Sequence, residues 1–420
     1  MSSNIVAAID IGTSKTYTLI SMVDSSSGTA KVIGYGIAKT SGVTQGIIVN
    51  PENAARSIAV SVKNAEEMAS KLFPGIKIES AVFSIGDRYI ESVTKASAIK
   101  LSDKPREITA FDKRELEDIV EKKYIDGSKA LIHKSVYNYR VDTSGIIKDP
   151  EGKEGTRLEA VVYLVFCRKK SLDDITVAAE KAGIKVEKFM FKGWGTAVAA
   201  STEDERKNGI IIADIGAGSS SVSIFKNGRM IYTTVIPMGG ESFTNDISVV
   251  IDIDKESAEG IKREMSSLTN DAIKHEKFEI ESKGKSVEVE LLNVKEIIDA
   301  RSEELLESIM TKIAESNFGD LAVNGIAFTG GAVKTAGFID KARRVMNMAV
   351  RVAEIQKIKG FEDALYRQEG VTGLGSLVSA ISEIEITPAG KSQAKKVKKE
   401  KSGESFFSKL TEKMKSFIFE

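Results

Sequence analysis

Two short motifs in the sequence place an aspartate just before a glycine-rich turn. One runs Asp10-Ile-Gly-Thr-Ser and the other Asp214-Ile-Gly-Ala-Gly-Ser-Ser, and the two copies begin 204 residues apart. Consecutive backbone N–H groups in such a turn can point into one concavity, which favours phosphate oxygens. The aspartate can hold a hydrated Mg²⁺, because this ion keeps several of its waters beside a phosphate. A single copy is more often an ordinary β-turn, whereas two facing copies would clamp a triphosphate between two halves of one protein.

Both motifs are expected to lie between two strands. Runs rich in Ile and Val precede the turns at 5–12 and 209–216, and the sequences TYTLI and VSIFKNGRMIYTTVI follow them. β-Branched and aromatic residues favour strands. The pattern therefore excludes a dinucleotide fingerprint or a Walker loop, since both run from a strand into a helix. The tripeptide Gly-Lys-Ser at 284–286 and 390–392 lacks the glycine required five positions earlier, and we interpret both copies as loop residues.

Two further segments have residues suited to the rest of a nucleotide. The segment 325–343 is predicted to form a buried strand, a Gly330-Gly331 turn and a helix, and its glycines would let a base or ribose approach the backbone. Glu259, Lys262 and Arg263 share one helical face, with an acceptor for ribose hydroxyls and a guanidinium to stack on adenine. An ordinary strand-to-helix connection and a solvated ion-pair stripe remain the alternatives.

The composition is typical of a cytoplasmic globular protein. A chain of 420 residues is too long for one ordinary core, so two or more subdomains are expected. The 60 Lys and Arg residues balance the 60 Asp and Glu residues, which argues against a protein coated in positive charge for nucleic acid. The single cysteine, Cys167, excludes an intramolecular disulfide, and with only two histidines a His/Cys zinc site is nearly excluded.

The segment pattern indicates α/β layers. Strand-like runs alternate with helical stretches such as 51–72 and 172–182. The N-terminus lacks the basic region of a secretory signal, and no apolar run approaches the roughly 18 residues that span a bilayer. Any membrane contact is therefore expected to be peripheral. We interpret His133, Cys167 and Trp194 as packing residues rather than catalytic groups.

The C-terminal tail differs in character from the body. Residues 391–420 hold nine Lys and four Glu, a net charge of +5. Residues 388–404 contain no aromatic residue and are expected to form a solvated linker. The following 405–420 segment is predicted to be an amphipathic helix that lies in a lipid interface rather than packing on the body. Its apolar face comprises Phe406, Phe407, Leu410, Met414, Phe417 and Ile418.

The order of these motifs resembles the actin, Hsp70 and sugar kinase superfamily. In that comparison 10–15 and 214–221 correspond to the two phosphate motifs, 330–334 to the adenosine motif, and 370–380 to the second connection between the halves. The nucleotide-binding residues that the resemblance and the turn chemistry imply are Asp10, Gly12, Thr13, Ser14, Lys15, Asp214, Gly216, Ala217, Gly218, Ser219, Ser220, Glu259, Lys262, Arg263, Gly330, Gly331, Ala332 and Lys334. Asp10 and Asp214 would hold Mg²⁺ through water.

Residues 80–166 narrow the resemblance to the FtsA family. SAVFSIGDRYIES, REITAFDKRELEDIV and YNYRVDTSGIIKDPEGKEGTRLEAVVYLV are similar to the insertion subdomain of that family, as VIPMGGESFTNDI is to a later segment. The resemblance implies an α/β, actin-like fold of two duplicated halves with an SHS2-like insertion. The implied subdomains are 1A (1–79 with 167–203), 1C (80–166), 2A (204–250 with 319–387) and 2B (251–318), followed by the linker (388–404) and a membrane-targeting helix (405–420).

The FtsA resemblance also implies a function in cell division. Members bind ATP with Mg²⁺, polymerise as actin-like filaments and tether FtsZ filaments to the cytoplasmic face of the cell membrane at the division site. The implied partners are the FtsZ C-terminal peptide, further copies of the chain, anionic lipid and later division proteins, with no nucleic acid. The family's peptide-contacting arginine corresponds to Arg301, for which a surface salt bridge is the alternative. Ala217 and Ser220 replace residues typical of the second turn, so hydrolysis is expected to be slow at most and no catalytic residue is assigned.

Two other functions are compatible with the same superfamily. One is a pilus-assembly actin homologue similar to PilM, which shares the insertion type. The other is a small-molecule kinase, which would need a catalytic base in the cleft and would gain nothing from a lipid-seeking tail.

Overall fold

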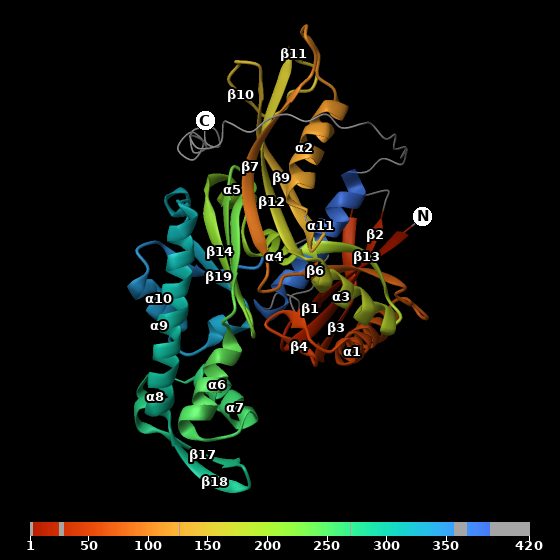
Figure 1. Ribbon diagram of the computed structural model, residues 1–420. Helices are drawn as coiled ribbons and strands as arrows, with labels where there is room; N and C mark the ends of the chain where they lie inside the picture. Colours follow the sequence, from red (N-terminus) through yellow and green to blue (C-terminus); the bar gives the residue numbers. More distant parts are fainter. Residues whose placement is uncertain (1–2, 25–28, 126, 269, 357–367, 387–420) are drawn as a thin grey trace.

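The computed structural model describes residues 3–24, 29–125, 127–268, 270–356 and 368–386. Its centre consists of two five-stranded sheets (Figure 1). The first has the order β3-β2-β1-β6-β13 and the second β16-β15-β14-β19-β20. The strands of the first sheet are β1 (Ser3–Ile11), β2 (Lys15–Asp24), β3 (Thr29–Lys39), β6 (Ser80–Ile85) and β13 (Lys185–Phe191). Those of the second are β14 (Ile210–Ile215), β15 (Ser220–Lys226), β16 (Arg229–Ile236), β19 (Ile326–Thr329) and β20 (Val350–Val352).

The two sheets repeat one topology. In each, three strands joined by hairpins pair antiparallel, and the first of these also pairs parallel with a later strand that continues to a second parallel neighbour. The central strands are almost wholly buried, as expected for Ile- and Val-rich strands covered on both faces. The predicted α/β class and the internal duplication are confirmed.

Two helices, α1 (Pro51–Ser70) and α3 (Lys169–Lys181), cover the first sheet. Helix α1 packs against β3 and β2, and α3 packs against α1 and β13. Helix α1 begins where the Asn50 side chain accepts a hydrogen bond from the Asn53 N–H, with Pro51 in the first turn. The predicted helices at 51–72 and 172–182 are thus confirmed to within a few residues.

Two helices join the halves. Helix α4 (Lys192–Ala200) follows β13 and contacts β14 and β15, while α11 (Val371–Ile386) packs along α4 and contacts β1 and β2. The short helix α5 (Glu203–Asn208) then leads into the second half. These helices connect the two sheets, because α4 touches strands of both halves and α11, which packs on α4, touches strands of the first half (Figure 1).

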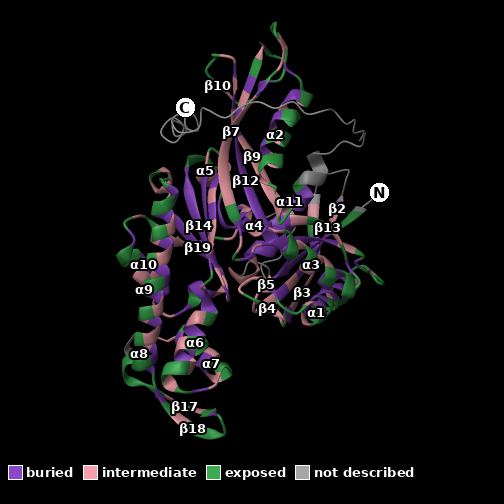
Figure 2. Cartoon of the chain, in the orientation of Figure 1, coloured by how far each residue is buried: buried purple, intermediate pink, exposed green. Residues whose placement is uncertain are grey.

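The insertion leaves the first half after β6 and returns to it before α3. It contains the sheet β10-β9-β12-β7 with helix α2 packed on it, a small pair β8 and β11, and a hydrophobic core of its own. The bounds are β7 (Glu91–Lys100), β8 (Arg106–Glu107), α2 (Ala110–Tyr124), β9 (Lys129–Val141), β10 (Ile146–Ile147), β11 (Glu154–Gly155) and β12 (Arg157–Arg168). Most of β12 is buried, and Figure 2 shows this strand between α2 and the second half.

The insertion contacts the second half through strand β16. The Tyr137 hydroxyl donates to the Met230 carbonyl at 2.7 Å, and the Ser92 hydroxyl donates to the Thr233 carbonyl at 2.9 Å. Arg229 donates to the Tyr137 carbonyl. The insertion is thus attached to the first half by its chain and to the second by hydrogen bonds.

A helical extension lies below the second sheet in Figure 1. It consists of α6 (Gly240–Ile251), α7 (Lys255–Met265), α8 (Asn270–His275), the hairpin β17 (Lys277–Ser282) and β18 (Lys285–Glu290), and α9 (Leu291–Ser316). Helix α10 (Phe338–Val345) packs on α9. A small hairpin of β4 (Val43–Thr44) and β5 (Ile47–Ile48) completes the first half. The Gly-Lys-Ser at 284–286 lies in the β17–β18 hairpin, so its interpretation as a loop holds only for its first residue.

Several expectations about single segments have clear outcomes. The helix predicted after Gly330-Gly331 begins later than expected: a 3-10 turn covers Gly331–Lys334, Gly337 has φ +77°, and α10 starts only at Phe338. A left-handed residue cannot continue an α-helix, which explains the delay. The predicted linker and lipid-binding helix lie outside the described residues. Among the helices of the described residues, none combines the length and the hydropathy that a membrane span requires.

Of the three presumed packing residues, Cys167 is buried, whereas His133 and Trp194 are partly buried. His133 is on β9 and stacks on Trp194, with ring centroids 5.3 Å apart, and burial lowers its pKa to about 4. Cys167 is a buried free thiol, and burial raises its pKa to about 12. None of the three lines the candidate site described next, and their interpretation as packing residues is confirmed.

Candidate functional site

One cavity of about 1360 Å³ lies between the two halves. It exceeds the roughly 300–1,000 Å³ of usual small-molecule sites, so it can hold a nucleotide together with ions and water. Its lining includes 17 of the 18 residues proposed for nucleotide binding: Asp10, Gly12, Thr13, Ser14, Lys15, Asp214, Gly216, Ala217, Gly218, Ser219, Glu259, Lys262, Arg263, Gly330, Gly331, Ala332 and Lys334. Ser220 does not line it, because its buried hydroxyl donates to the Met238 carbonyl at 2.7 Å.

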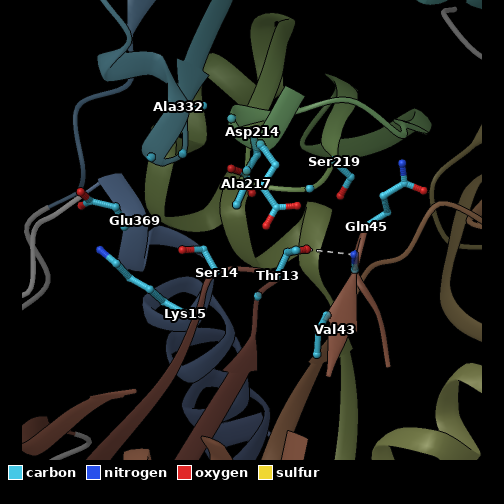
Figure 3. Close-up of a pocket in the computed structure, with 18 of the residues that line it drawn as sticks. Thr13, Ser14, Lys15, Val43, Gln45, Asp214, Ala217, Ser219, Ala332 and Glu369 are labelled. Atoms are coloured by element: carbon cyan, nitrogen blue, oxygen red, sulfur yellow. Dashed lines mark hydrogen bonds between the residues drawn. The ribbon is translucent and has the colours of Figure 1, made fainter. Parts of the chain in front are cut away.

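The two glycine-rich turns have the same backbone closure. In the first, the Gly12 N–H donates to the Lys15 carbonyl at 3.0 Å, and in the second the Gly216 N–H donates to the Ser219 carbonyl at 3.0 Å. Each turn joins two antiparallel strands of its own sheet. Figure 3 shows Thr13 and Ser14 of the first turn facing Ala217 of the second across the cavity.

A loop of the first half touches both turns. The Thr13 hydroxyl accepts from the Gly46 N–H at 3.1 Å (Figure 3). A Cβ at Gly218 would lie 2.6 Å from the Thr13 hydroxyl and 2.9 Å from the Gln45 N. Gly218 of the second turn therefore lies close to Thr13 of the first turn, and both turns border the cavity.

The two aspartates differ in their surroundings. Asp10 is buried, and one of its oxygens, Oδ1, lies 2.8 Å from the Lys192 ammonium, within ion-pair distance but not aligned for a hydrogen bond. Asp214 Oδ2 accepts from the Thr372 hydroxyl at 3.2 Å and from the Thr196 hydroxyl at 3.4 Å. Burial raises the pKa of Asp214, and the negative charge of Asp10 raises it further.

Asp214 also explains the glycine at the start of the third motif. Gly330 has φ +90°, and a Cβ there would lie 2.4 Å from Asp214 Oδ1 and 2.4 Å from the Ile215 carbonyl. Only glycine fits both the backbone conformation and the space. The third motif is thereby held against the end of the strand that carries the second carboxylate.

The helical face on α7 is an ion-paired network that borders the cavity. Glu259 accepts from the Lys262 ammonium and the Thr244 hydroxyl at 2.5 Å each, and from Arg263 Nε at 2.7 Å. Burial raises the pKa of Glu259, but the cation of Lys262 and these hydrogen bonds outweigh it and leave the pKa lowered. Lys262 is buried and also donates to the Gly240 carbonyl at 2.9 Å. These residues therefore fit both interpretations of this helical face. They form ion pairs with one another, and they line the cavity where a nucleotide could bind.

Several lining residues were not predicted. Lys192 begins α4 at the base of the first turn and Thr372 of α11 donates to Asp214, and both line the cavity. Thr196 of α4 also donates to Asp214 but lies outside the lining. Glu369 lies opposite Lys15 in Figure 3 and pairs with Lys334 at 2.7 Å. Lys192, Thr196 and Glu369 belong to no duplicated or glycine-rich motif, and Thr372 lies in the 370–380 segment, which was assigned to the connection between the halves and not to the cavity. The only signal was the Lys192 charge directly after the apolar run that ends β13.

Arg301 lies away from the cavity on helix α9. Its guanidinium pairs in a bidentate manner with Asp246 of α6, at 2.5 and 2.9 Å, and with Glu304 at 2.6 Å. The hydrogen bond to Asp246 raises the pKa of Arg301. In the described structure Arg301 therefore forms the salt bridge that was its alternative interpretation, and it remains partly exposed for another acceptor.

Family models match two parts of the chain. The model "Cell division protein FtsA" matches residues 211–375, and the model "SHS2 domain inserted in FTSA" matches residues 88–166. Together the matches cover more than half of the 420 residues. The second match coincides with the insertion that carries its own sheet and core.

Curated relatives match nearly the whole length. The chain is 29% identical to the cell division protein FtsA of Pseudomonas aeruginosa over 385 residues, with 91% of this chain and 90% of that protein covered. It is 28% identical to FtsA of Bacillus subtilis, covering 91% and 85%, and 27% identical to FtsA of Escherichia coli strain K12, covering 87% of each.

Solved structures show the same fold at lower identity. The PilM-PilN type IV pilus biogenesis complex aligns with a TM-score of 0.63 at 13% identity, covering 91% of this chain and 99% of that one. MreB 5 of Spiroplasma citri bound to AMPPNP aligns with a TM-score of 0.51 at 13% identity, covering 91% and 98%. These likenesses show an actin-like architecture. With its duplicated halves and its matched insertion, the chain belongs to the FtsA family of actin-like cell division proteins.

Proposed function

We propose that this division protein binds ATP with Mg²⁺ between its two halves, polymerises, and tethers FtsZ filaments to the cytoplasmic face of the cell membrane at the division site. The observation that carries the proposal is the pair of turns with identical backbone closure that border one cavity. Backbone N–H groups from both halves are available there to phosphate oxygens. A nucleotide held by both turns would stabilise one relative position of the halves.

The chemistry of the lining supports one orientation for the proposed nucleotide. Its phosphates would lie between 12–15 and 216–219, where backbone N–H groups and the Thr13, Ser14 and Ser219 hydroxyls gather. The ribose and adenine would lie between the 3-10 turn at Gly331–Lys334 and the network on α7. Arg263, whose side chain is largely exposed, has the freedom to stack on a base.

The carboxylates fit a magnesium ion held mainly by water and phosphate. Both threonine partners of Asp214 bond to Oδ2, and neither bonds to Oδ1. Within the described residues no group of three or more His, Cys, Asp or Glu side chains could hold a metal directly. The carboxylates of Asp10 and Asp214 suit Mg²⁺, which prefers one or two carboxylates and several waters. When bound, the ion would neutralise phosphate charge.

Attachment to FtsZ is assigned to the extension that carries Arg301. The α6–α9 pair of Asp246 and Arg301 offers a partly exposed guanidinium to a carboxylate of the FtsZ C-terminal peptide. Membrane attachment is assigned to 405–420, outside the described residues, on the basis of its amphipathic pattern. Polymerisation would multiply these weak contacts into firm attachment.

The proposal is tested by flotation of anionic vesicles with FtsZ, MgATP and this protein. Full-length protein is expected to carry FtsZ to the vesicle fraction. A chain ending at Glu404 should stay with FtsZ in the soluble fraction, and Arg301→Glu should float without FtsZ. Equal flotation of FtsZ with all three proteins would contradict the tethering role.

The alternatives receive less support. The likeness to PilM extends to the fold at 13% identity, whereas the FtsA matches cover sequence in both the body and the insertion. A small-molecule kinase needs a base beside an acceptor, and the two aspartates at the phosphate end are engaged with Lys192, Thr196 and Thr372. Pulldown of pilus components, or a phosphorylated small molecule, would reverse this ranking.

A further inference from the structure

Lys192 places a fixed cation at the phosphate end of the cavity. It is the first residue of α4, and its ammonium donates to the Ile11 carbonyl at 2.8 Å while lying 2.8 Å from Asp10 Oδ1. These two residues directly precede the first glycine-rich turn. The Lys192 side chain is only 17% exposed, yet it lines the cavity.

Contacts along its whole length fix the position of the Lys192 side chain. Its aliphatic stem runs over Gly86 at the end of β6, where a Cβ would lie 3.0 Å from both Cβ and Cδ of Lys192. A larger residue at Gly86 would displace the stem. Thus a glycine, a backbone carbonyl and a carboxylate together hold the ammonium against the turn.

The ammonium retains capacity for a ligand. It carries three N–H donors, and within the described residues one of them makes a hydrogen bond, to Ile11. Its charge also reaches the second carboxylate, since Lys192 opposes the effect of burial and of Asp10 on the pKa of Asp214. Two carboxylates facing a triphosphate would repel it, and Lys192 offsets part of that repulsion without any metal.

We propose that Lys192 contacts the terminal phosphates of a bound nucleoside triphosphate and acts as a resident cation that makes binding only weakly dependent on Mg²⁺. This inference rests on the proposed nucleotide site and concerns how that site neutralises phosphate charge. Mg²⁺ commonly binds substrate phosphates directly and so supplies part of this neutralisation when it is present.

The test compares ATP dissociation constants in excess Mg²⁺ and in EDTA, measured by equilibrium dialysis on full-length protein. Lys192→Met keeps the stem over Gly86 and removes the charge. Lys341→Met is the matched control, because Lys341 is 15% exposed, pairs with Glu303 at 2.7 Å and donates to the Asp299 carbonyl at 2.9 Å, outside the cavity. Thermal unfolding of each variant reports folding, and Lys192→Gln provides a second uncharged variant if Lys192→Met is unstable.

The wild type and Lys341→Met are expected to lose less than about tenfold in ATP affinity when Mg²⁺ is removed. Lys192→Met or Lys192→Gln should lose at least about tenfold more than the wild type. Equal ratios in all proteins, with ATP still bound in Mg²⁺, would overturn the role of Lys192 and leave the nucleotide site standing. Absence of ATP binding to the wild type in both buffers would overturn the proposed site and this inference together.

Discussion

At the scale of single residues, the cavity holds two neighbouring carboxylates, and ionising Asp214 lowers the stability of the folded protein. Asp214 is held by two threonine hydroxyls, but burial and the neighbouring Asp10 still raise its pKa. A group whose pKa is raised in the folded state stabilises the fold when protonated and loses that contribution as pH rises through its folded pKa. At neutral pH the ionised Asp214 carboxylate therefore lowers the free energy of unfolding.

Asp214→Asn is expected to raise the melting temperature of the nucleotide-free protein at pH 7 by about 1–3 °C. The difference from the wild type should shrink as pH falls towards the ordinary aspartate value of 3.8, where the wild type gains its proton first in the folded state. Asp112→Asn is the control of opposite sign, because Arg106 holds the pKa of the Asp112 carboxyl well below its usual range. That variant should be less stable at pH 7. A lower melting temperature for Asp214→Asn would contradict this account.

Gly330→Ala separates steric fit from backbone strain. The new Cβ would meet Asp214 Oδ1 and the Ile215 carbonyl at 2.4 Å. The control is Gly228→Ala in the β15–β16 turn, where φ is also positive, +73°, but no atom lies within 4 Å of the Cβ. Gly228→Ala should cost about 1 kcal/mol in urea unfolding and Gly330→Ala about 2–4 kcal/mol. Equal costs would mean that the contact with Asp214 is not tight.

At the scale of elements, the insertion is docked on a strand of the opposite half. The buried Tyr137 hydroxyl donates to the Met230 carbonyl of β16, and Ser92 donates to Thr233 of the same strand. Movement of the second sheet would therefore act on the insertion through β16. Strand β16 therefore connects the half that carries the second turn of the cavity with the surface of the insertion.

Tyr137→Phe is expected to lower the free energy of unfolding by about 1 kcal/mol, because it leaves a buried carbonyl without this donor. The more specific readout is amide hydrogen exchange, which should become faster in residues 229–236. Tyr139→Phe is the matched control, since the Tyr139 hydroxyl donates to Glu117 within the insertion. If exchange in β16 were unchanged in Tyr137→Phe, or changed equally in both variants, the docking contact would not be significant in solution.

The sequence predicted those elements that repeat or that carry strong local signals. The aspartate and glycine-rich turn occurs twice, and the structure gives both copies the same hydrogen bond. The contact of Tyr137 with β16 could not be predicted, because it joins segments 93 residues apart without a shared pattern. Helix α10 starts late because Gly337 is left-handed, a conformation that the sequence allows but does not require. Lys192 was missed for a similar reason: only the fold brings α4 to the first turn.

At the scale of the whole molecule, the two halves meet at the cavity and along α4 and α11. The hydroxyls of Thr196 on α4 and Thr372 on α11 lie 2.8 Å apart and both lie within hydrogen-bond distance of Asp214 Oδ2, so the helices that join the halves also hold a carboxylate of the site. The Ser84 and Ser376 hydroxyls, 3.0 Å apart, link β6 to α11 in the interior. Ligand in the cavity would thus bias the position of both halves at once.

The central claim is that one nucleotide is gripped by turns from both halves. It is tested most directly by amide hydrogen exchange of full-length protein with and without MgATP. We predict slower exchange in both 12–16 and 216–220, and no change in the β17–β18 turn at 282–285, which also contains Gly-Lys. Protection of one turn alone, or of neither, would contradict the claim.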